Sequence, residues 1–301
     1  MSLPISADNP FQVLIAESND DPTQLQSRYE KHRTNRNEQQ RGKILAEDFP
    51  GWSLDEILMK LDGPAKEEEF LDPRNCLVIW ARPPPHVQDM ISFVQEELRK
   101  VAPTLWLMPR ENLHTTVLEV AHSLTEAQID DLVKTLKSST TITQAQIAEH
   151  PLAHQSRLLK PMVSFDASAM ALSFAPAAGE PSAEQSAGHD DQYTYHHLRR
   201  DVFDMVRAAG IPVASRYIVP SAHVTIARFI TQDGFEVAGQ VDHARVKLII
   251  DKIGEINEKL ESMYWPQPGD TQPEKGEWVV GKGQGLVIRK GRLWYGGGEN
   301  V

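Results

Sequence analysis

Two short segments of this sequence combine a histidine with a threonine two positions later. His114 precedes Thr116 in this way, and His223 precedes Thr225, and both pairs occur in apolar, β-rich surroundings. Side chains at positions i and i+2 of a β-strand point to the same face. We therefore expect each histidine to share one face of a strand with its threonine.

Two imidazoles and two hydroxyl groups in one cleft would suit the hydrolysis of a phosphodiester. This reaction needs a base to activate water and an acid to protonate the departing alkoxide. Histidine can do either near neutral pH because its ordinary pKa is about 6.5. Threonine hydroxyls can donate hydrogen bonds to the non-bridging phosphate oxygens, where negative charge must be stabilised. The motifs thus predict in-line hydrolysis without a metal or another cofactor.

A single motif of this kind would be a weak indication, because a lone histidine on a strand is more often a hydrogen-bonded core residue. Two motifs with similar apolar flanks favour a shared function. Strand parity, counted from His223, turns Arg228 to the opposite face, so we expect no direct phosphate contact from it. We assign His196 and His197, in a predicted helix, to a solvated face.

The elements that must position the motifs occur twice in the same order, as a helix, a strand and then the motif. Val87–Val101 and Tyr195–Ala209 have the apolar spacing of helices. We read this as a weak internal duplication, which predicts an α+β protein of two lobes whose antiparallel sheets face a central cleft, with helices outside. Further helices are expected over Thr125–Leu136 and Val246–Met263, and strands over Cys76–Arg82, Leu105–Met108, Leu113–Val120, Met170–Phe174, His223–Phe229, Trp278–Val280, Gly285–Arg289 and Leu293–Tyr295.

Residues 1–70 differ from the rest and predict a partly helical N-terminal extension. Gln24–Leu45 is polar and would form a solvated helix or stay mobile. Ser53 and Glu56 have the spacing of a capping box for a short helix. A terminal arm packed on the main domain is the plainer interpretation, and a docking extension is the functional one. Residues 71–301 would form the two-lobed domain, with a flexible insertion around 176–191.

Composition excludes several classes of partner. The chain has 301 residues and a net charge of −11, so long double-stranded nucleic acid is not an expected ligand. A short anionic substrate is still compatible, because a local pocket can be positive. Cys76 is the only cysteine, which favours a reducing compartment, the cytoplasm or nucleus. No apolar run approaches the ~20 residues that cross a bilayer. We expect a monomer that does not enter membranes.

The two motifs resemble those of the two-histidine (2H) phosphoesterase superfamily, which includes LigT-like RNA ligases and 2′,3′-cyclic nucleotide phosphodiesterases. The resemblance rests on His114/Thr116 and His223/Thr225 and extends in layout over Asn75–Val301. It implies a bilobal LigT-like fold, catalytic histidines in both motifs and no required metal. Implied substrates are nucleotides or short RNA ends, such as 2′,3′-cyclic phosphates, ADP-ribose 1″,2″-cyclic phosphate or oligonucleotide ends. By analogy His223 is the base and His114 the acid, although the residues themselves do not rank them.

Four further residues are candidates for substrate binding. Arg216 and Tyr217 shortly precede the second motif, and Trp294 and Tyr295 could stack on a nucleobase. Aromatic residues are nevertheless more often part of the core. Two other functions stay open: trimming of 3′ ends or 2′,5′-linked oligonucleotides, and nucleotide binding without catalysis.

Overall fold

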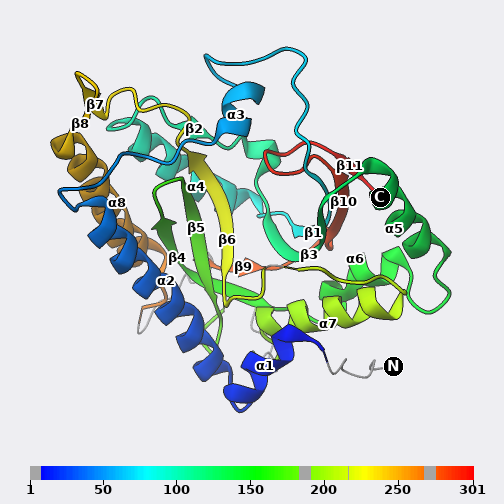
Figure 1. Cartoon of the computed structure of the whole chain (residues 1–301). Coiled ribbons are helices and arrows are strands. Elements are labelled where there is room, and N and C mark those ends of the chain that lie inside the picture. Colours follow the sequence, from blue (N-terminus) through cyan, green and yellow to red (C-terminus); the bar gives the residue numbers. More distant parts are fainter. Residues whose placement is uncertain (1–7, 183–190, 216, 268–275) are drawn as a thin grey trace.

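The computed structural model describes residues 8–182, 191–215, 217–267 and 276–301. It has the expected α+β composition, with helices packed around a large antiparallel sheet (Figure 1). The sheet strands are β1 (Asn75–Ala81), β2 (Trp106–Leu107), β3 (Thr115–Leu124), β4 (Arg157–Phe165), β5 (Ala169–Pro176), β6 (Ala222–Arg228), β9 (Trp278–Val279), β10 (Val287–Gly291) and β11 (Glu299–Asn300). A separate hairpin comprises β7 (Glu236–Val237) and β8 (Gln240–Val241).

The expectation of two separate sheets is wrong, because the strands form one sheet in the order β11-β10-β1-β3-β6-β5-β4-β9, with β2 paired to β6. The two halves meet where β3 pairs with β6, and the register there joins Thr115 to Val224. The histidine-bearing segments are therefore neighbours at the centre of the sheet. This junction explains how motifs from separate parts of the chain come together.

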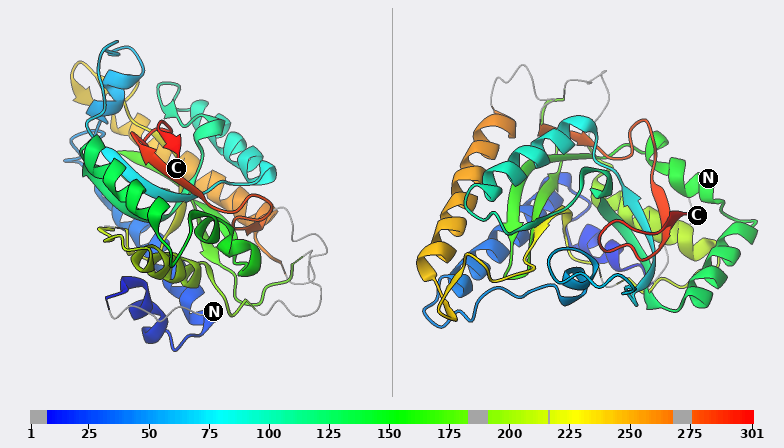
Figure 2. Two further views of the ribbon diagram at one scale, coloured as in Figure 1. Left: turned by 90° about the vertical axis from the view of Figure 1, so that its right-hand side faces the viewer. Right: turned by 90° about the horizontal axis from the view of Figure 1, so that it is seen from above.

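The helices pack across the two halves of the sheet. They are α1 (Pro10–Glu17), α2 (Pro22–Ile44), α3 (Glu56–Leu61), α4 (Pro85–Arg99), α5 (Glu126–Ser138), α6 (Gln144–Ala153), α7 (Tyr195–Ala208) and α8 (His243–Tyr264). The helix α4 follows β1 but packs against β6 and α8, whereas α7 follows β5 but packs against β3. Each motif strand is thus covered by a helix that belongs to the other half of the sheet. Figure 2 shows the helices arranged around the sheet in two further views.

Several sequence-based boundaries need correction. Leu293–Tyr295 is not a strand, and the last strand of the tail is β11. The strand β4 and the helix α6 were not predicted. The N-cap of α3 is Asp55 rather than Ser53, and its carboxylate accepts from the backbone of Leu58. The expected insertion around 176–191 falls partly outside the described residues. Within the part of the chain that is described, no helix is both long and apolar enough to span a bilayer.

The N-terminal segment forms part of the folded core. The polar helix α2 buries one face against β4 and β5, and α1 packs against α7. Trp52 stacks on Phe229 with ring centroids 3.9 Å apart. The assignment of His196 and His197 to a solvated face is wrong, because both are buried. Their α7 face is covered by the N-terminal segment, which sequence periodicity alone does not reveal.

His196 ties this segment to α7 through both ring nitrogens. Its Nδ1 lies 2.8 Å from the Tyr29 hydroxyl and its Nε2 3.0 Å from the Phe11 carbonyl oxygen. Since a carbonyl only accepts, Nε2 carries the proton and Nδ1 accepts from Tyr29. Burial, reinforced by the nearby Arg199, lowers the pKa of His196 to about 3. The ring is therefore neutral in the folded protein at neutral pH.

We expect acid to destabilise the fold through His196. Below its ordinary pKa of about 6.5 the unfolded chain binds a proton that the folded chain excludes down to about pH 3. The free energy of unfolding therefore falls with decreasing pH, by up to about 1.4 kcal/mol per pH unit for this group. Chemical denaturation at pH 7, 6 and 5 should show a shallower pH dependence for His196→Gln than for wild type. Equal slopes would contradict this role.

Candidate active site

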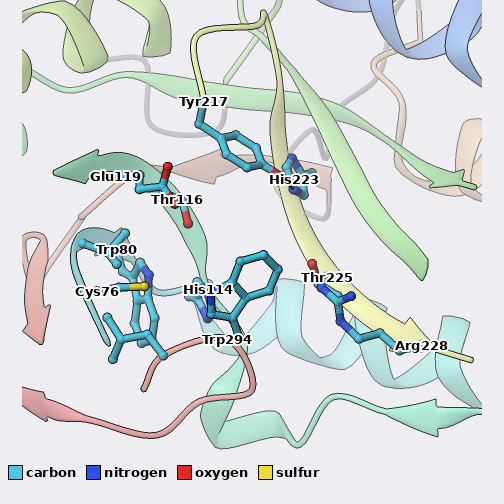
Figure 3. A pocket seen from close by; sticks show the side chains of 12 residues that line it. Cys76, Trp80, His114, Thr116, Glu119, Tyr217, His223, Thr225, Arg228 and Trp294 are labelled. Atoms are coloured by element: carbon cyan, nitrogen blue, oxygen red, sulfur yellow. Dashed lines mark hydrogen bonds between the residues drawn. The ribbon is translucent and has the colours of Figure 1, made fainter. Parts of the chain in front are cut away.

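The four motif residues line one pocket of about 370 Å³ over the junction of β3 and β6 (Figure 3). His114 directly precedes β3, and Thr116, His223 and Thr225 lie on the two strands. All four side chains are partly exposed, while Thr115 and Val224 between them are buried. The predicted i and i+2 alternation is therefore present in both motifs. The further lining residues are Cys76, Val78, Trp80, Glu119, Tyr217, Arg228, Leu293 and Trp294.

The antiparallel pairing of β3 with β6 places the histidine of each motif beside the threonine of the other. Thr115 is opposite Val224, so one step to either side places His114 beside Thr225 and Thr116 beside His223. Figure 3 shows this arrangement, with the β6 residues facing those of β3 and of the segment before it across the pocket. Each imidazole thus has a hydroxyl group from the other motif as its cross-strand neighbour.

A β-bulge follows each threonine and brings a charged residue to the pocket. The pairing of β3 with β1 shifts by one residue at Val117, and that of β6 with β5 shifts at Ile226. An extra residue reverses the alternation of side chains. Consequently Glu119 and Arg228, each three positions after a threonine, line the pocket. Our expectation that Arg228 faces away is wrong, because strand parity does not hold across a bulge. The equal spacing of these charges from the two threonines was the available signal.

The His114 ring is held by its backbone neighbour and by Trp80. Its Nδ1 lies 2.7 Å from the carbonyl oxygen of Asn112, so Nδ1 carries a proton and Nε2 is the nitrogen left for the pocket. The ring stacks on the buried Trp80 with centroids 3.7 Å apart. Burial lowers the pKa of His114 to about 3, and the positive charges of Arg82 and Arg289 act in the same direction.

The His223 ring is positioned by residues of the loop before β6. Its Nδ1 lies 2.9 Å from the hydroxyl oxygen of Ser221, and the Tyr217 hydroxyl is 3.4 Å from Nε2. Burial is the main cause that lowers the pKa of His223 to about 4, and the positive charges of Arg199, Arg36 and Arg228 act in the same direction. Both catalytic candidates are therefore neutral at pH 7.

Arg199 of α7 connects the two motifs from behind the sheet, although the sequence analysis did not identify it. It is fully buried and donates to the carbonyl oxygen of Val117, the bulge residue of β3, at 3.2 Å. It also donates to the carbonyl oxygens of Val219 and Tyr217 in the loop before His223. A single guanidinium thus ties the first bulge to the loop that carries Tyr217.

Of the four further candidates for substrate binding, two line the pocket and two do not or are not described. Tyr217 and Trp294 line the pocket, and the guanidinium of Arg74 lies 4.2 Å from the Trp294 ring centre. Tyr295 is not among the lining residues, because its hydroxyl is held 2.5 Å from the Asp55 carboxylate. Arg216 lies outside the described residues.

The C-terminal tail is seated against the segment that holds His114. The Asn112 side chain donates to the carbonyl oxygen of Tyr295 at 3.0 Å. Gly296 has φ of +103°, and a Cβ there would lie 1.9 Å from Cγ of Asn112, so no larger residue fits without displacing the tail. The Asn112 carbonyl that orients His114 is thereby placed by the tail that also presents Trp294.

Among the described residues, no group of three or more His, Cys, Asp and Glu side chains is arranged to hold a metal ion. The pocket offers two imidazoles, the hydroxyl groups of Thr116, Thr225 and Tyr217, the Arg228 guanidinium, the Glu119 carboxylate and the Cys76 thiol. These groups can transfer protons and bind an anion.

The comparisons with known proteins add little to this site. No protein-family model matches the sequence, and no curated protein matches it. One similar solved structure is a conserved protein of unknown function from Agrobacterium tumefaciens, with 12% sequence identity and a TM-score of 0.44. The alignment covers 82% of this chain and 98% of that one. A likeness of this degree carries no functional assignment.

Proposed function

We propose that this protein is a metal-independent phosphodiesterase of the 2H type that hydrolyses 2′,3′-cyclic phosphates of nucleotides or RNA ends. One observation carries the proposal: His114 and His223 line one pocket where β3 and β6 pair, each beside the other motif's threonine. Two proton-transfer groups and two hydroxyl donors around one centre are the parts that in-line displacement at phosphorus needs.

In the proposed reaction, His223 is the base and His114 the acid. Water attacks phosphorus and gives its proton to Nε2 of His223, while the bond from phosphorus to one ribose oxygen breaks. Nε2 of His114 protonates that oxygen. The Asn112 carbonyl supports this division, because an acceptor at Nδ1 favours the imidazolium form of His114. The Ser221 hydroxyl can accept from Nδ1 of His223 and so leave its Nε2 unprotonated.

The bound phosphate must raise the pKa of His114 so that the ring takes up a proton from solvent before it acts as the acid. Burial holds the pKa of His114 at about 3. An anionic phosphate within about 4–6 Å favours the charged form and raises this pKa. Thr116, Thr225 and Arg228 are placed to donate to the non-bridging oxygens, since they line the same pocket. The acid is therefore charged mainly in the complex.

We expect hydrolysis of the four 2′,3′-cyclic mononucleotides to persist in EDTA, because the proposed acid, base and phosphate donors are all side chains. The measurement is product formation by chromatography with and without the chelator. Abolition by EDTA and recovery on adding a divalent metal would contradict the proposal. Hydrolysis of linear 2′,5′- or 3′,5′-linked adenylate dinucleotides in the same assay would identify a trimming enzyme. Nucleotide binding without turnover of any substrate would identify a binding module.

A further inference from the structure

A second groove of about 380 Å³ continues from the active-site pocket across the same face of the sheet. Ser173 and Ala171 of β5, the cross-strand partners of His223 and Thr225, lie in its wall. The helix α2 of the N-terminal segment contributes the other wall. We call it the α2 groove. It shares several lining residues with the pocket, namely Tyr217, His223, Thr225, Arg228 and Trp294.

The charged side chains that line the α2 groove are mainly cationic. Arg33, Arg36 and Arg228 supply guanidinium groups, and Asp166 is the one carboxylate among the lining residues. Arg36 pairs with Asp166 at 2.6 Å, and Arg228 pairs at 3.1 Å with Asp55, which is not a lining residue. On a chain with net charge −11, this local excess of positive charge favours an anionic ligand.

In the part of the chain that the structure describes, two of these arginines have buried N–H groups without an acceptor. Arg33 is 5% exposed and donates through Nη1 to the carbonyl oxygens of Lys160 and Ser173. Its guanidinium also lies over the ring of Trp265. Among the described residues, its Nε and Nη2 have no hydrogen-bond partner, nor has Nε of Arg228. Buried donors in native proteins are normally paired. The lining guanidinium groups come from α2 and from β6, and guanidinium groups suit an anion with several acceptor oxygens.

We propose that the α2 groove binds a second phosphate of the substrate, carried on the 5′ oxygen of the nucleoside whose 2′,3′-cyclic phosphate is hydrolysed. The inference rests on the proposed function, which places the cyclic phosphate between His114 and His223. The other phosphate-bearing oxygen of such a nucleoside is the 5′ oxygen. The substrate class is thus a 5′-phosphorylated nucleoside 2′,3′-cyclic phosphate, with its 5′-phosphate either free or linking the nucleoside to an RNA chain.

The first arm of the test compares adenosine 2′,3′-cyclic phosphate with its 5′-phosphorylated form and with a dinucleotide ending in the cyclic phosphate. We expect kcat/KM to be about tenfold or more higher for a 5′-phosphorylated substrate, as one charge-assisted contact would give. Comparing the substrate that has a free 5′-phosphate with the dinucleotide shows whether the enzyme prefers a mononucleotide or an RNA end. Equal kcat/KM for all three would overturn the inference.

The matched variants are Arg36→Gln and Arg41→Gln. Both arginines are on α2, about half exposed and paired with one aspartate, but only Arg36 lines the groove. The preference for 5′-phosphorylated substrate should fall about fivefold in Arg36→Gln, a partial loss because the site is hydrated. It should be unchanged in Arg41→Gln. An unchanged preference in Arg36→Gln, or an equal fall in both variants, would contradict the assignment.

A binding arm separates this inference from the proposed hydrolysis. Calorimetry measures the affinities of wild type and Arg36→Gln for adenosine 3′,5′-bisphosphate and adenosine 3′-monophosphate. If wild type binds the bisphosphate more tightly than the monophosphate and Arg36→Gln weakens this preference, the α2 groove binds the second phosphate. This holds even if no cyclic phosphate is turned over, and only the proposed function then fails. Turnover of cyclic phosphates with equal affinity for both ligands overturns the groove and leaves the proposed function intact.

Discussion

Replacing either His114 or His223 by alanine is expected to lower kcat/KM for 2′,3′-cyclic nucleotides by about 10²- to 10⁴-fold, the usual contribution of a positioned acid or base. The expected loss is large for both residues because each serves a different proton transfer on the same phosphate. Neither change should unfold the protein, since both side chains line the pocket and neither residue belongs to the hydrophobic core. The measurement is steady-state turnover together with circular dichroism of each variant.

His243→Ala is the matched control for these variants. His243 is exposed at the start of α8 and does not line the pocket. It should retain the wild-type rate. A folded His114→Ala or His223→Ala variant with the same rate as His243→Ala would remove that histidine from the mechanism.

Thr116→Val and Thr225→Val are expected to lower kcat by about 10²-fold each, comparable to the loss of one donor to a developing oxyanion. Valine keeps the shape of threonine and removes only the hydroxyl. The two effects should be similar because the antiparallel pairing of β3 with β6 gives each threonine the same relation to a histidine. Since the donors act mainly in the transition state, kcat should change more than KM.

Thr115→Val provides the control in the same strand. Thr115 is 1% exposed and is not among the pocket-lining residues, so its hydroxyl has no access to substrate. We expect its kcat to stay close to that of wild type. If Thr115→Val and Thr116→Val lowered kcat equally, the loss would reflect a disturbed strand rather than phosphate binding.

Local rules grouped the motif residues of this site correctly and identified Tyr217 and Trp294, but they misplaced Arg228 and did not identify Glu119. The two-residue alternation of a strand correctly grouped His114 with Thr116 and His223 with Thr225. The same rule failed for Arg228, because a bulge depends on pairing with a neighbouring strand, and a single sequence does not reveal that pairing.

Long-range packing explains the other differences between sequence and structure. The two halves join in one sheet because β6 pairs with β3 and with β2, a pairing that no local pattern encodes. His196 occupies a position that would be exposed on an isolated α7, but the N-terminal segment buries it. That segment also supplies Arg33 and Arg36 to the α2 groove, although its polar composition predicted a solvated helix.

The double variant His114→Ala/His223→Ala tests most directly whether the two histidines act as a unit on one phosphate. Groups that serve one reaction together give strongly non-additive losses. The rate of the double variant on a 2′,3′-cyclic nucleotide should therefore be close to that of the slower single variant. A double variant slower by the product of the two single losses would show independent contributions and contradict the proposed mechanism.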